Sequence, residues 1–267
     1  MAILLTLFII LVVYLFLLKG RTGHKDLPAL RRWSYAHRGL HSTGIPENSL
    51  SAFAAAKNSG YGIELDVHLM KDGNLAVIHD ASLKRTAGKD ILIENLTAPE
   101  LEIYRLENTE ERVPLLSQVL DLIDGEVPLI IELKPQKDNY EALCETACNL
   151  LEGYKGLYCM ESFDPRCVAW LRKHRSNVVR GQLTENFLRS GLDYPWLLRF
   201  AMKHQLLNLF SRPDFVAYRF SDRKTISNLI CRRIWGVQGF TWTICTREDF
   251  DTAVQEDWIP IFENLKP

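Results

Sequence analysis

Strand-like runs and helix-like runs alternate along most of this chain. Eight runs favour strands, at residues 34–37, 62–68, 129–134, 157–162, 178–183, 215–219, 239–244 and 259–263. Helices are predicted between them, near 48–59, 115–123, 140–151, 165–174, 223–233 and 247–255, where apolar residues recur at spacings of three and four. Such alternation is typical of βαβ units, and eight strands favour a closed α/β barrel, the (β/α)8 TIM barrel.

Composition is consistent with one such domain. The chain has 267 residues, of which 47% are hydrophobic, so it can bury one substantial core. Its formal net charge of −1 argues against a nucleic-acid partner, because nucleic-acid-binding proteins usually carry a clustered basic excess.

The N-terminus is apolar from residue 2 to residue 18, with only Thr6 and Tyr14 carrying a polar side-chain atom. A helix of that length would extend roughly 26 Å at about 1.5 Å per residue, close to the thickness of a hydrocarbon core. A cleaved signal peptide fits less well, since no basic residue precedes the run and no small-x-small cleavage site follows it. We therefore predict one retained transmembrane helix.

Basic residues follow this run, at Lys19, Arg21, Lys25, Arg31 and Arg32. Because basic flanks favour the cytoplasmic side, the remainder of the chain is predicted to face the cytoplasm. The predicted organisation is a transmembrane anchor at 1–19, a basic juxtamembrane linker at 20–32 and the barrel at 33–267.

Two acidic side chains share one face of the second predicted strand. Side chains alternate along a strand, so Glu64 and Asp66 face one way and their apolar neighbours face the other. If both carboxylates ionise in a cleft, their repulsion must be relieved by protonation, a basic partner or a metal. Hard oxygen ligands suit Mg²⁺ or Ca²⁺, so we predict a divalent cation here.

Further polar residues occur near the C-terminal ends of apolar strands. Glu132 and Lys134 share a face of the third predicted strand, and His37 and His79 each precede a charged residue. Two histidines can divide the roles of general acid and general base. Because active sites of α/β barrels lie at the C-terminal ends of the strands, we expect these residues to meet Glu64 and Asp66 at one rim.

Six segments resemble the glycerophosphodiester phosphodiesterase family, a group of phospholipase-like (β/α)8 barrels, and they occur in the family's order. They lie at residues 36–39, 46–49, 63–67, 71–73, 79–80 and 128–134. Later segments at 161–165 and 241–243 are similar too, so the resemblance covers about residues 33–264. The chain departs from the family at its end, where Glu263-Asn264-Leu265 stands in place of a Thr-Asp-x-Pro turn, so substrate contacts at that rim could differ.

The resemblance implies a role for each of these polar residues. General acid and base would be His37 and His79, the cation ligands Glu64, Asp66 and Glu132, and the phosphate-binding residues Arg38 and Lys134. It implies metal-assisted hydrolysis of a glycerophosphodiester to sn-glycerol 3-phosphate and an alcohol. Direct attack by water and attack through a cyclic phosphate both remain open.

Other interpretations are kept beside this one. A lysophospholipase D or sphingomyelinase D-like activity fits an enzyme anchored at the surface that holds its substrate. Glycoside hydrolysis fits less well, because Glu64 and Asp66 project side by side from one strand. In another class, an inactive membrane-tethered barrel would bind lipids or a partner, although no expected site residue is missing.

Several positions have more than one interpretation. Trp242 could pack over the glycerol or a choline-like headgroup, or simply fill the core. The stretch 194–210 could be an interfacial helix, but an ordinary amphipathic barrel helix is favoured. We expect Asn48 to cap the following helix, His68 to be structural and Glu47 to lie outside the metal shell. Oligomeric state is left open.

Overall fold

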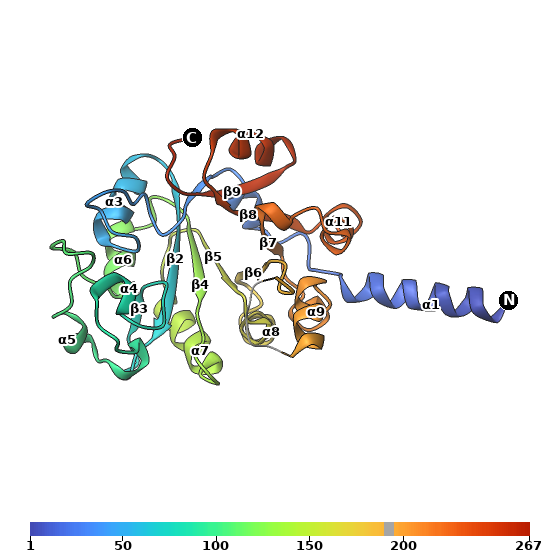
Figure 1. The fold of residues 1–267 in the computed structure, drawn as a ribbon, viewed down its shortest axis with the longest axis horizontal. Helices are drawn as coiled ribbons and strands as arrows, with labels where there is room; N and C mark the ends of the chain where they lie inside the picture. Colours follow the sequence, from blue (N-terminus) through green and yellow to red (C-terminus); the bar gives the residue numbers. More distant parts are fainter. Residues whose placement is uncertain (190–194) are drawn as a thin grey trace.

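The computed structural model describes residues 1–189 and 195–267 of the chain. Eight parallel strands close into a barrel in the order β1, β9, β8, β7, β6, β5, β4, β2, with β2 returning to β1 (Figure 1). They are β1 (Tyr35–Ala36), β2 (Gly62–Leu69), β4 (Leu129–Leu133), β5 (Tyr158–Ser162), β6 (Val179–Thr184), β7 (Phe215–Arg219), β8 (Gln238–Ile244) and β9 (Trp258–Phe262). The predicted TIM barrel is confirmed, and each strand end lies within one residue of its prediction.

A short extra strand, β3 (Leu75–Val77), pairs antiparallel with β2 and brings the chain to His79. The longer helices of the barrel layer are α3 (Leu50–Asn58), α6 (Leu116–Ile123), α7 (Tyr140–Leu150), α8 (Pro165–His174), α9 (Trp196–Lys203), α11 (Ile226–Arg233) and α12 (Arg247–Gln255). Short helices α2 (Leu27–Leu30), α4 (Lys84–Ala87), α5 (Ala98–Leu101) and α10 (Asn208–Ser211) lie in the connections.

Apolar residues form two main layers of core. Outward-facing residues of the strands, such as Ile63 and Leu65 of β2, pack against the surrounding helices. Inside the barrel, Tyr35, Phe215 and Phe240 form an aromatic cluster that also includes Leu27 and Leu30 of the helix before β1. This alternation leaves Glu64 and Asp66 facing the barrel interior, as predicted.

Two local predictions are wrong. The helix after residue 48 is capped by Ser49, whose Oγ accepts the Ala52 N–H, while Asn48 instead bonds the side chain of Asp66. The stretch 194–210 is divided into α9 and α10, separated at a turn where Gln205 has a positive φ. Tyr194 lies outside the described residues.

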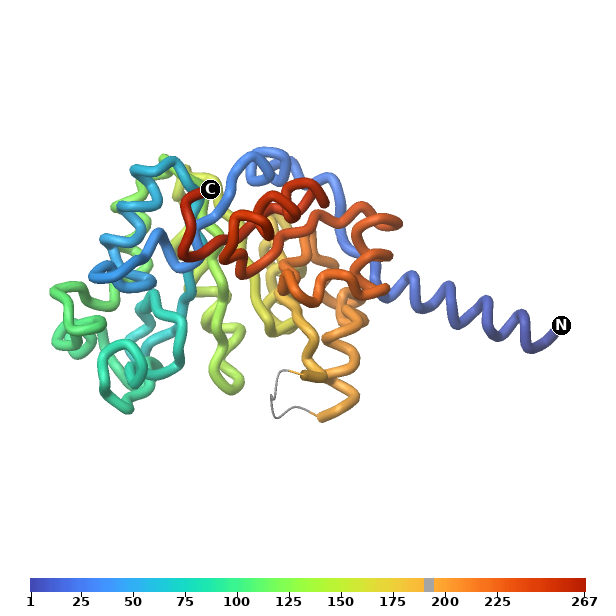
Figure 2. The backbone as a smooth tube through the Cα atoms, turned by 45° about the horizontal axis from the view of Figure 1, so that its top comes forward, coloured from blue at the N-terminus to red at the C-terminus, as the bar shows by residue number. Residues whose placement is uncertain are grey.

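The apolar N-terminal helix α1 (Ala2–Leu17) projects away from the barrel (Figures 1 and 2). It has 16 residues, because Leu18 leaves the helix and is buried against the barrel. Among residues 1–189 and 195–267, no helix is long and apolar enough to cross a membrane. The predicted transmembrane helix is therefore not supported, and its division from the linker at residue 20 stays a prediction.

The aromatic cluster inside the barrel should dominate its stability. Phe215 is fully buried, its ring lies 4.4 Å from that of Phe240, and it fills the space beside Gly181, where a Cβ would come within 2.1 Å of it. Replacing a buried Phe by Ala typically lowers the free energy of unfolding by about 3–5 kcal/mol. We expect that loss for Phe215→Ala in urea unfolding.

Phe210→Ala is the matched control, because the Phe210 side chain is 60% exposed. Its free energy of unfolding should change by no more than about 0.5 kcal/mol. Equal losses for the two variants would contradict the assignment of Phe215 to the core.

Candidate active site

Three carboxylates meet inside the barrel at the C-terminal ends of β2 and β4. Glu64 and Asp66 come from β2, and Glu132 lies beside Asp66 because these two residues are partners in the parallel register. One oxygen atom from each lies within 4.8 Å of the other two, and all three residues are buried. The structure thus brings together the three residues predicted as cation ligands.

Lys134 supplies positive charge to this cluster. Its Nζ lies 2.9 Å from Glu132 Oε1 and 3.1 Å from Asp66 Oδ1, and Arg38 Nε lies 3.6 Å from Asp66 Oδ2. Burial alone would raise the pKa of Asp66, but Lys134, His79 and Arg38 outweigh it and hold that pKa well below its usual range. Asp66 is therefore a carboxylate anion.

The other two carboxylates remain short of positive charge. Burial, together with repulsion from Asp66, raises the pKa of Glu64 well above its usual value, and burial raises the pKa of Glu132 to about 7. A hard divalent cation bound between these oxygens would relieve the repulsion and favour both ionised forms. The donor set therefore fits Mg²⁺ or Ca²⁺, with Glu64, Asp66 and Glu132 as ligands.

His37 follows β1 and is oriented by a carboxylate from the other end of the chain. Its Nδ1 lies 2.7 Å from Glu263 Oε2, while Nε2 lies 3.9 Å from Glu64 Oε2. A carboxylate can only accept, so Nδ1 carries the proton and Nε2 faces the cluster. Burial lowers the pKa of His37, although Glu263 acts in the opposite direction.

His79 is held in the same way. Its Nδ1 lies 2.6 Å from Asp80 Oδ1, which leaves Nε2 as the other ring nitrogen available for chemistry. Burial and the charge of Lys134 lower the pKa of His79. Both predicted histidines thus lie at this rim, each with a carboxylate on Nδ1.

A chain of ion pairs links the two sides of the rim. Arg38 Nη1 donates to Glu47 at 2.9 Å, and Arg85 Nη1 donates to Glu47 at 3.0 Å while its Nε donates to Asp80 at 2.7 Å. Glu47 therefore lies outside the three-carboxylate cluster, as predicted. His68, predicted to be structural, is buried, and its Nε2 lies 3.1 Å from the backbone carbonyl oxygen of His79.

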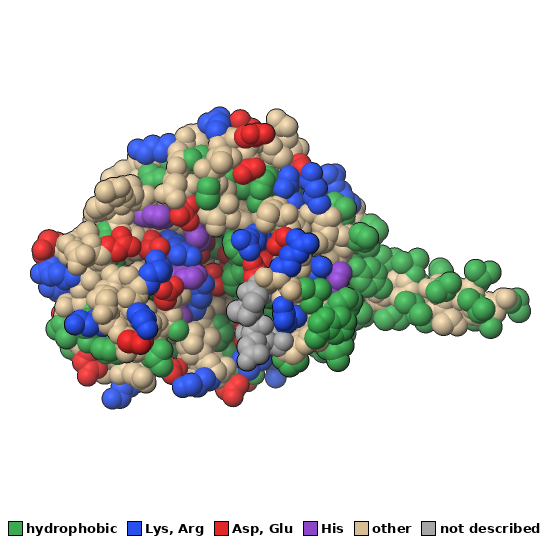
Figure 3. All heavy atoms as spheres, in the orientation of Figure 1, with side chains coloured by type: hydrophobic (Ala, Val, Ile, Leu, Met, Phe, Trp, Pro, Cys, Tyr) green, Lys and Arg blue, Asp and Glu red, His purple; other side chains and the backbone are tan. Residues whose placement is uncertain are grey.

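Both histidines, two of the three carboxylates and two basic residues line one cavity of about 80 Å³; they are His37, His79, Glu64, Glu132, Arg38 and Lys134. Its polar side includes His37, His79 and Lys134, and its other side includes Phe163 and Trp242. Their rings meet edge to face at 5.5 Å, and Trp242 Nε1 donates to the Ala217 carbonyl, so Trp242 forms a fixed aromatic wall. In Figure 3, histidine, acidic and basic side chains gather around a hollow on the face of the barrel.

Sequence reasoning missed four residues of this site, Glu161, Glu263, Asp80 and Arg85. Glu161 of β5 is paired with Glu132 of β4 in the parallel register, and it lines the cavity. Its buried Oε2 has no hydrogen-bond partner among the described residues. Its inward position could have been found by applying the alternation rule to β5. Nothing local in the sequence places Glu263, whose partner His37 is 226 positions away, or the contact of Arg85 with Glu47, although Arg85 also bonds Asp80, five residues before it.

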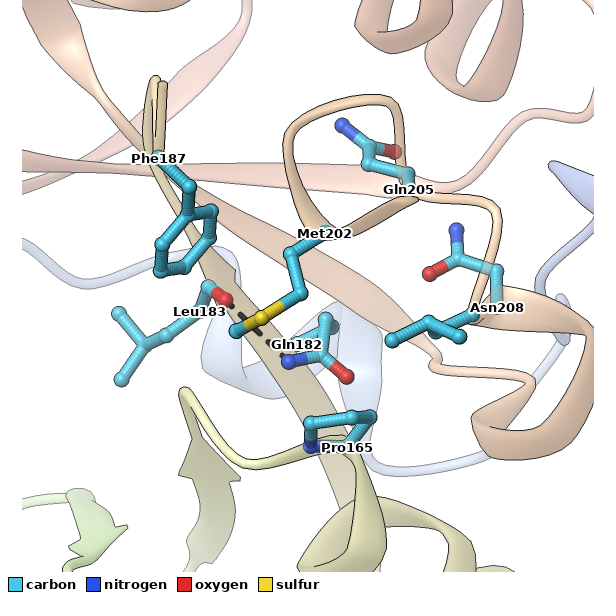
Figure 4. Close-up of a pocket in the computed structure, with 8 residues that line it drawn as sticks. Pro165, Gln182, Leu183, Phe187, Met202, Gln205 and Asn208 are labelled. Atoms are coloured by element: carbon cyan, nitrogen blue, oxygen red, sulfur yellow. Dashed lines mark hydrogen bonds between the residues drawn. The ribbon is translucent and has the colours of Figure 1, made fainter. Parts of the chain in front are cut away.

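A second pocket lies behind β6, between α8, α9 and α10 (Figure 4). Gln182, Met202 and Asn208 point into it, but it holds only about 10 Å³. That is room for about one water molecule, so it is too small for a substrate.

The Glu263 carboxylate should control the charge of His37. A neighbouring anion favours the protonated imidazole, so Glu263→Gln should lower the pKa of His37 further, as measured by an NMR titration of its ring. Asp80→Asn is the matched control, because it should lower the pKa of His79 and leave His37 nearly unchanged. An unchanged or higher pKa of His37 in the Glu263 variant would show that this contact does not form in solution.

Known protein sequences match most of this chain. The glycerophosphoryl diester phosphodiesterase family matches residues 37–261. A glycerophosphodiester phosphodiesterase of Caldanaerobacter subterraneus subsp. tengcongensis is 29% identical over 232 residues, which are 82% of this chain and 88% of that protein. A lysophospholipase D of Rattus norvegicus is 32% identical over 133 residues, covering 45% of this chain and 41% of that protein.

Solved structures share the fold. An Oleispira antarctica phosphodiesterase in complex with the product sn-glycerol-3-phosphate matches with a TM-score of 0.71 at 21% identity, over 86% of this chain and 92% of that one. A glycerophosphodiester phosphodiesterase from Thermotoga maritima matches with a TM-score of 0.65 at 25% identity, over 86% and 93%. Because the family match spans most of the barrel, this chain belongs to the glycerophosphoryl diester phosphodiesterase family.

Proposed function

We propose that this protein hydrolyses glycerophosphodiesters to sn-glycerol 3-phosphate and an alcohol, with one divalent cation, Mg²⁺ or Ca²⁺. The observation that carries the proposal is the cluster of three buried carboxylates with two carboxylate-held histidines on one cavity. A salt-bridge cluster retained only for stability is a weaker explanation, because buried ion pairs barely offset their desolvation.

The side chains of the cavity divide the work of hydrolysis. Lys134 and Arg38 offset the negative charge of the substrate phosphate. A bound cation would act as a Lewis acid and polarise the phosphate group. One histidine, neutral because burial lowers its pKa, accepts a proton from the attacking hydroxyl group or water. The other, whose protonated form the bound phosphate favours, donates a proton to the leaving oxygen.

Purified protein should release sn-glycerol 3-phosphate from glycerophosphocholine, and EDTA should abolish that release until Mg²⁺ or Ca²⁺ is added back. His37→Ala and His79→Ala should each lower kcat by about 10²–10⁴-fold, the usual contribution of a positioned acid or base. The measurement is a coupled assay of sn-glycerol 3-phosphate with and without chelator.

His174→Ala is the control for histidine loss, because His174 stacks on Trp170 outside the cavity, and its kcat should change less than about twofold. Full turnover after exhaustive chelation would reject the cation. No turnover of any phosphodiester by the wild-type protein would favour an inactive barrel that binds lipids.

We also propose that the protein lies on a lipid surface through an apolar region around the base of α1. Among the described residues, 22 large apolar side chains are exposed, of which 12 belong to residues 1–16 and six to α9, α10, α11 or the residue after α11. Figure 3 shows apolar side chains along α1 and on the adjoining surface. Monomeric soluble proteins rarely expose a patch of this kind.

The barrel itself fixes the direction of α1. Trp235 Nε1 donates to the Leu15 carbonyl at 2.8 Å, and Arg212 Nη1 donates to the carbonyl of Phe16 at 2.9 Å. These bonds cap the C-terminal end of the helix, and Lys19 and Arg212 add positive charge beside it. A rigid apolar helix with basic residues at its base suits an interfacial position on anionic lipid. That the barrel faces the cytoplasm stays a prediction.

Charges placed on α1 should weaken this contact without affecting chemistry. For the double variant Phe8→Glu/Leu11→Glu, binding to phosphatidylcholine/phosphatidylglycerol vesicles should fall at least about tenfold in a sedimentation assay, because buried apolar area is lost. Hydrolysis of glycerophosphocholine in solution should stay within about twofold of wild type.

Ile103→Glu is the control, since Ile103 is 72% exposed but lies outside this region. Its vesicle binding should equal that of wild type. The proposal fails if the wild-type protein stays in the supernatant, or if the double variant sediments as well as wild type.

A further inference from the structure

Three arginines line a pocket at the end of the barrel opposite the candidate active site. The pocket has a volume of about 310 Å³ and is lined by Arg31, Arg232, Arg233 and Asp257, together with residues 236–239. Residues 238 and 239 begin β8, and Asp257 directly precedes β9, so the pocket lies at the N-terminal ends of these two parallel strands. It is therefore separate from the histidines and carboxylates at the C-terminal ends.

Positive charge in this pocket exceeds negative charge. Three guanidinium groups and one carboxylate, that of Asp257, line it, which leaves a net charge of +2. Arg31 Nη2 lies 3.1 Å from Asp257 Oδ1, whereas the Arg233 side chain forms no ion pair or hydrogen bond within residues 1–189 and 195–267. The nearby Glu256 carboxylate is occupied by Arg223, at 2.7 Å. The pocket therefore suits an anion.

Arg232 is held in place without a ligand. Its guanidinium carbon lies 3.6 Å from the centre of the Trp258 ring, and its Nη2 donates to the backbone carbonyls of Glu256 and Asp257. Both hydrogen bonds use Nη2, so Nη1 can donate to a ligand. Burial lowers the pKa of Arg232 to about 10; Asp257 opposes this effect, and the charge of Arg233 adds to it. A bound anion would supply the negative charge that this guanidinium lacks.

Exposed apolar side chains adjoin the pocket. Ile226, Leu229 and Arg233 are three and four residues apart, so they share one face of α11, and the two apolar residues are 72% and 47% exposed. Ile234 follows and is exposed, and Trp235 donates to a carbonyl near the C-terminal end of α1, which lies beside α11 in Figures 1 and 2. An arginine at the end of such a stripe can reach lipid phosphates while the stripe contacts acyl chains.

We propose that this pocket binds the phosphate monoester of an anionic phospholipid, a phosphatidate-like headgroup, in the surface on which α1 and α11 lie. The proposal rests on the proposed lipid contact and adds to it a ligand of defined chemistry. A phosphate monoester carries a charge of about −1.5 to −2 and three free acceptor oxygens, which match three guanidinium groups and a net charge of +2. The phosphodiester of other headgroups has fewer free oxygens and less charge, so it fits less well.

Vesicle sedimentation tests the lipid ligand. Phosphatidylcholine/phosphatidate vesicles should bind wild-type protein at least about threefold more tightly than phosphatidylcholine/phosphatidylglycerol vesicles of equal surface charge. The double variant Arg31→Gln/Arg233→Gln should bind the phosphatidate vesicles about 10- to 30-fold more weakly, the loss expected for two arginines at an anionic surface. Both side chains are exposed, so the fold should persist, and glycerophosphocholine turnover should stay within about twofold of wild type.

Arg105→Gln/Arg112→Gln is the matched control, because it removes the same charge from the connection after α5, on the opposite side of the barrel from α11 (Figure 1). Its binding to phosphatidate vesicles should stay within about twofold of wild type. Asp257→Asn should instead tighten binding by about fivefold, because it removes the carboxylate from the pocket. Asp257 has a φ of 60°, which asparagine also adopts, so this substitution keeps the backbone conformation.

A soluble ligand separates the pocket from the membrane contact. Dihexanoylphosphatidate below its critical micelle concentration should shift the NMR signals of Arg232 Nε and Arg233 Nε. The double variant Phe8→Glu/Leu11→Glu should show the same shifts, although it binds vesicles weakly. A soluble phosphate monoester shares the headgroup chemistry, but sn-glycerol 3-phosphate at the same concentration should shift these signals less, because it has no acyl chain to contact α11.

Four results would overturn the proposal. They are equal binding of phosphatidate vesicles by wild type and Arg31→Gln/Arg233→Gln, an equal loss in the Arg105/Arg112 control, equal binding of the phosphatidylglycerol vesicles, and shifts with sn-glycerol 3-phosphate as large as with the lipid. The last result would assign the pocket to a soluble phosphate. If wild type sediments with no vesicle, the membrane contact fails, and shifts with dihexanoylphosphatidate still support the headgroup site; no shift rejects it.

Discussion

The repulsion between Glu64, Asp66 and Glu132 is the constraint around which the rest of the site is arranged. Three carboxylates this close cannot all ionise inside a barrel without compensating positive charge. Lys134 and Arg38 supply part of it, which holds Asp66 ionised but leaves the pKa of Glu132 at about 7. The remaining deficit is what makes a divalent cation the natural partner, so the electrostatics and the proposed chemistry have the same origin.

The histidines depend on a second set of carboxylates, which orients them. Glu263 and Asp80 each occupy Nδ1 of one imidazole, so both rings can keep Nε2 for the substrate. Asp80 is in turn bound by Arg85, which reaches Arg38 through Glu47. The family's Thr-Asp-x-Pro turn is absent here, yet Glu263 provides a carboxylate to His37 from that part of the chain.

Helix α9 lies between the interior of the barrel and its exposed surface. Leu198 and Met202 line a groove of about 730 Å³ that shares Lys134 with the cavity, whereas Trp196 and Leu197 of the same helix are exposed. One helix thus carries both part of the groove wall and part of the exposed apolar surface.

The sequence by itself determined the barrel and the cluster of three carboxylates, because both depend on local periodicity. Alternation along β2 and β4 places Glu64, Asp66 and Glu132 inward, and parallel strands bring their C-terminal ends to one rim. Only the tertiary structure decided that Glu263 contacts His37, which is 226 positions away in the sequence. It also decided that the Asn48 side chain donates a hydrogen bond to Asp66 and does not cap the following helix. The tertiary structure also sets the end of α1 at Leu17, because Leu18 is buried against the barrel. Contacts between distant residues are set by how the whole chain packs, and no local pattern encodes them.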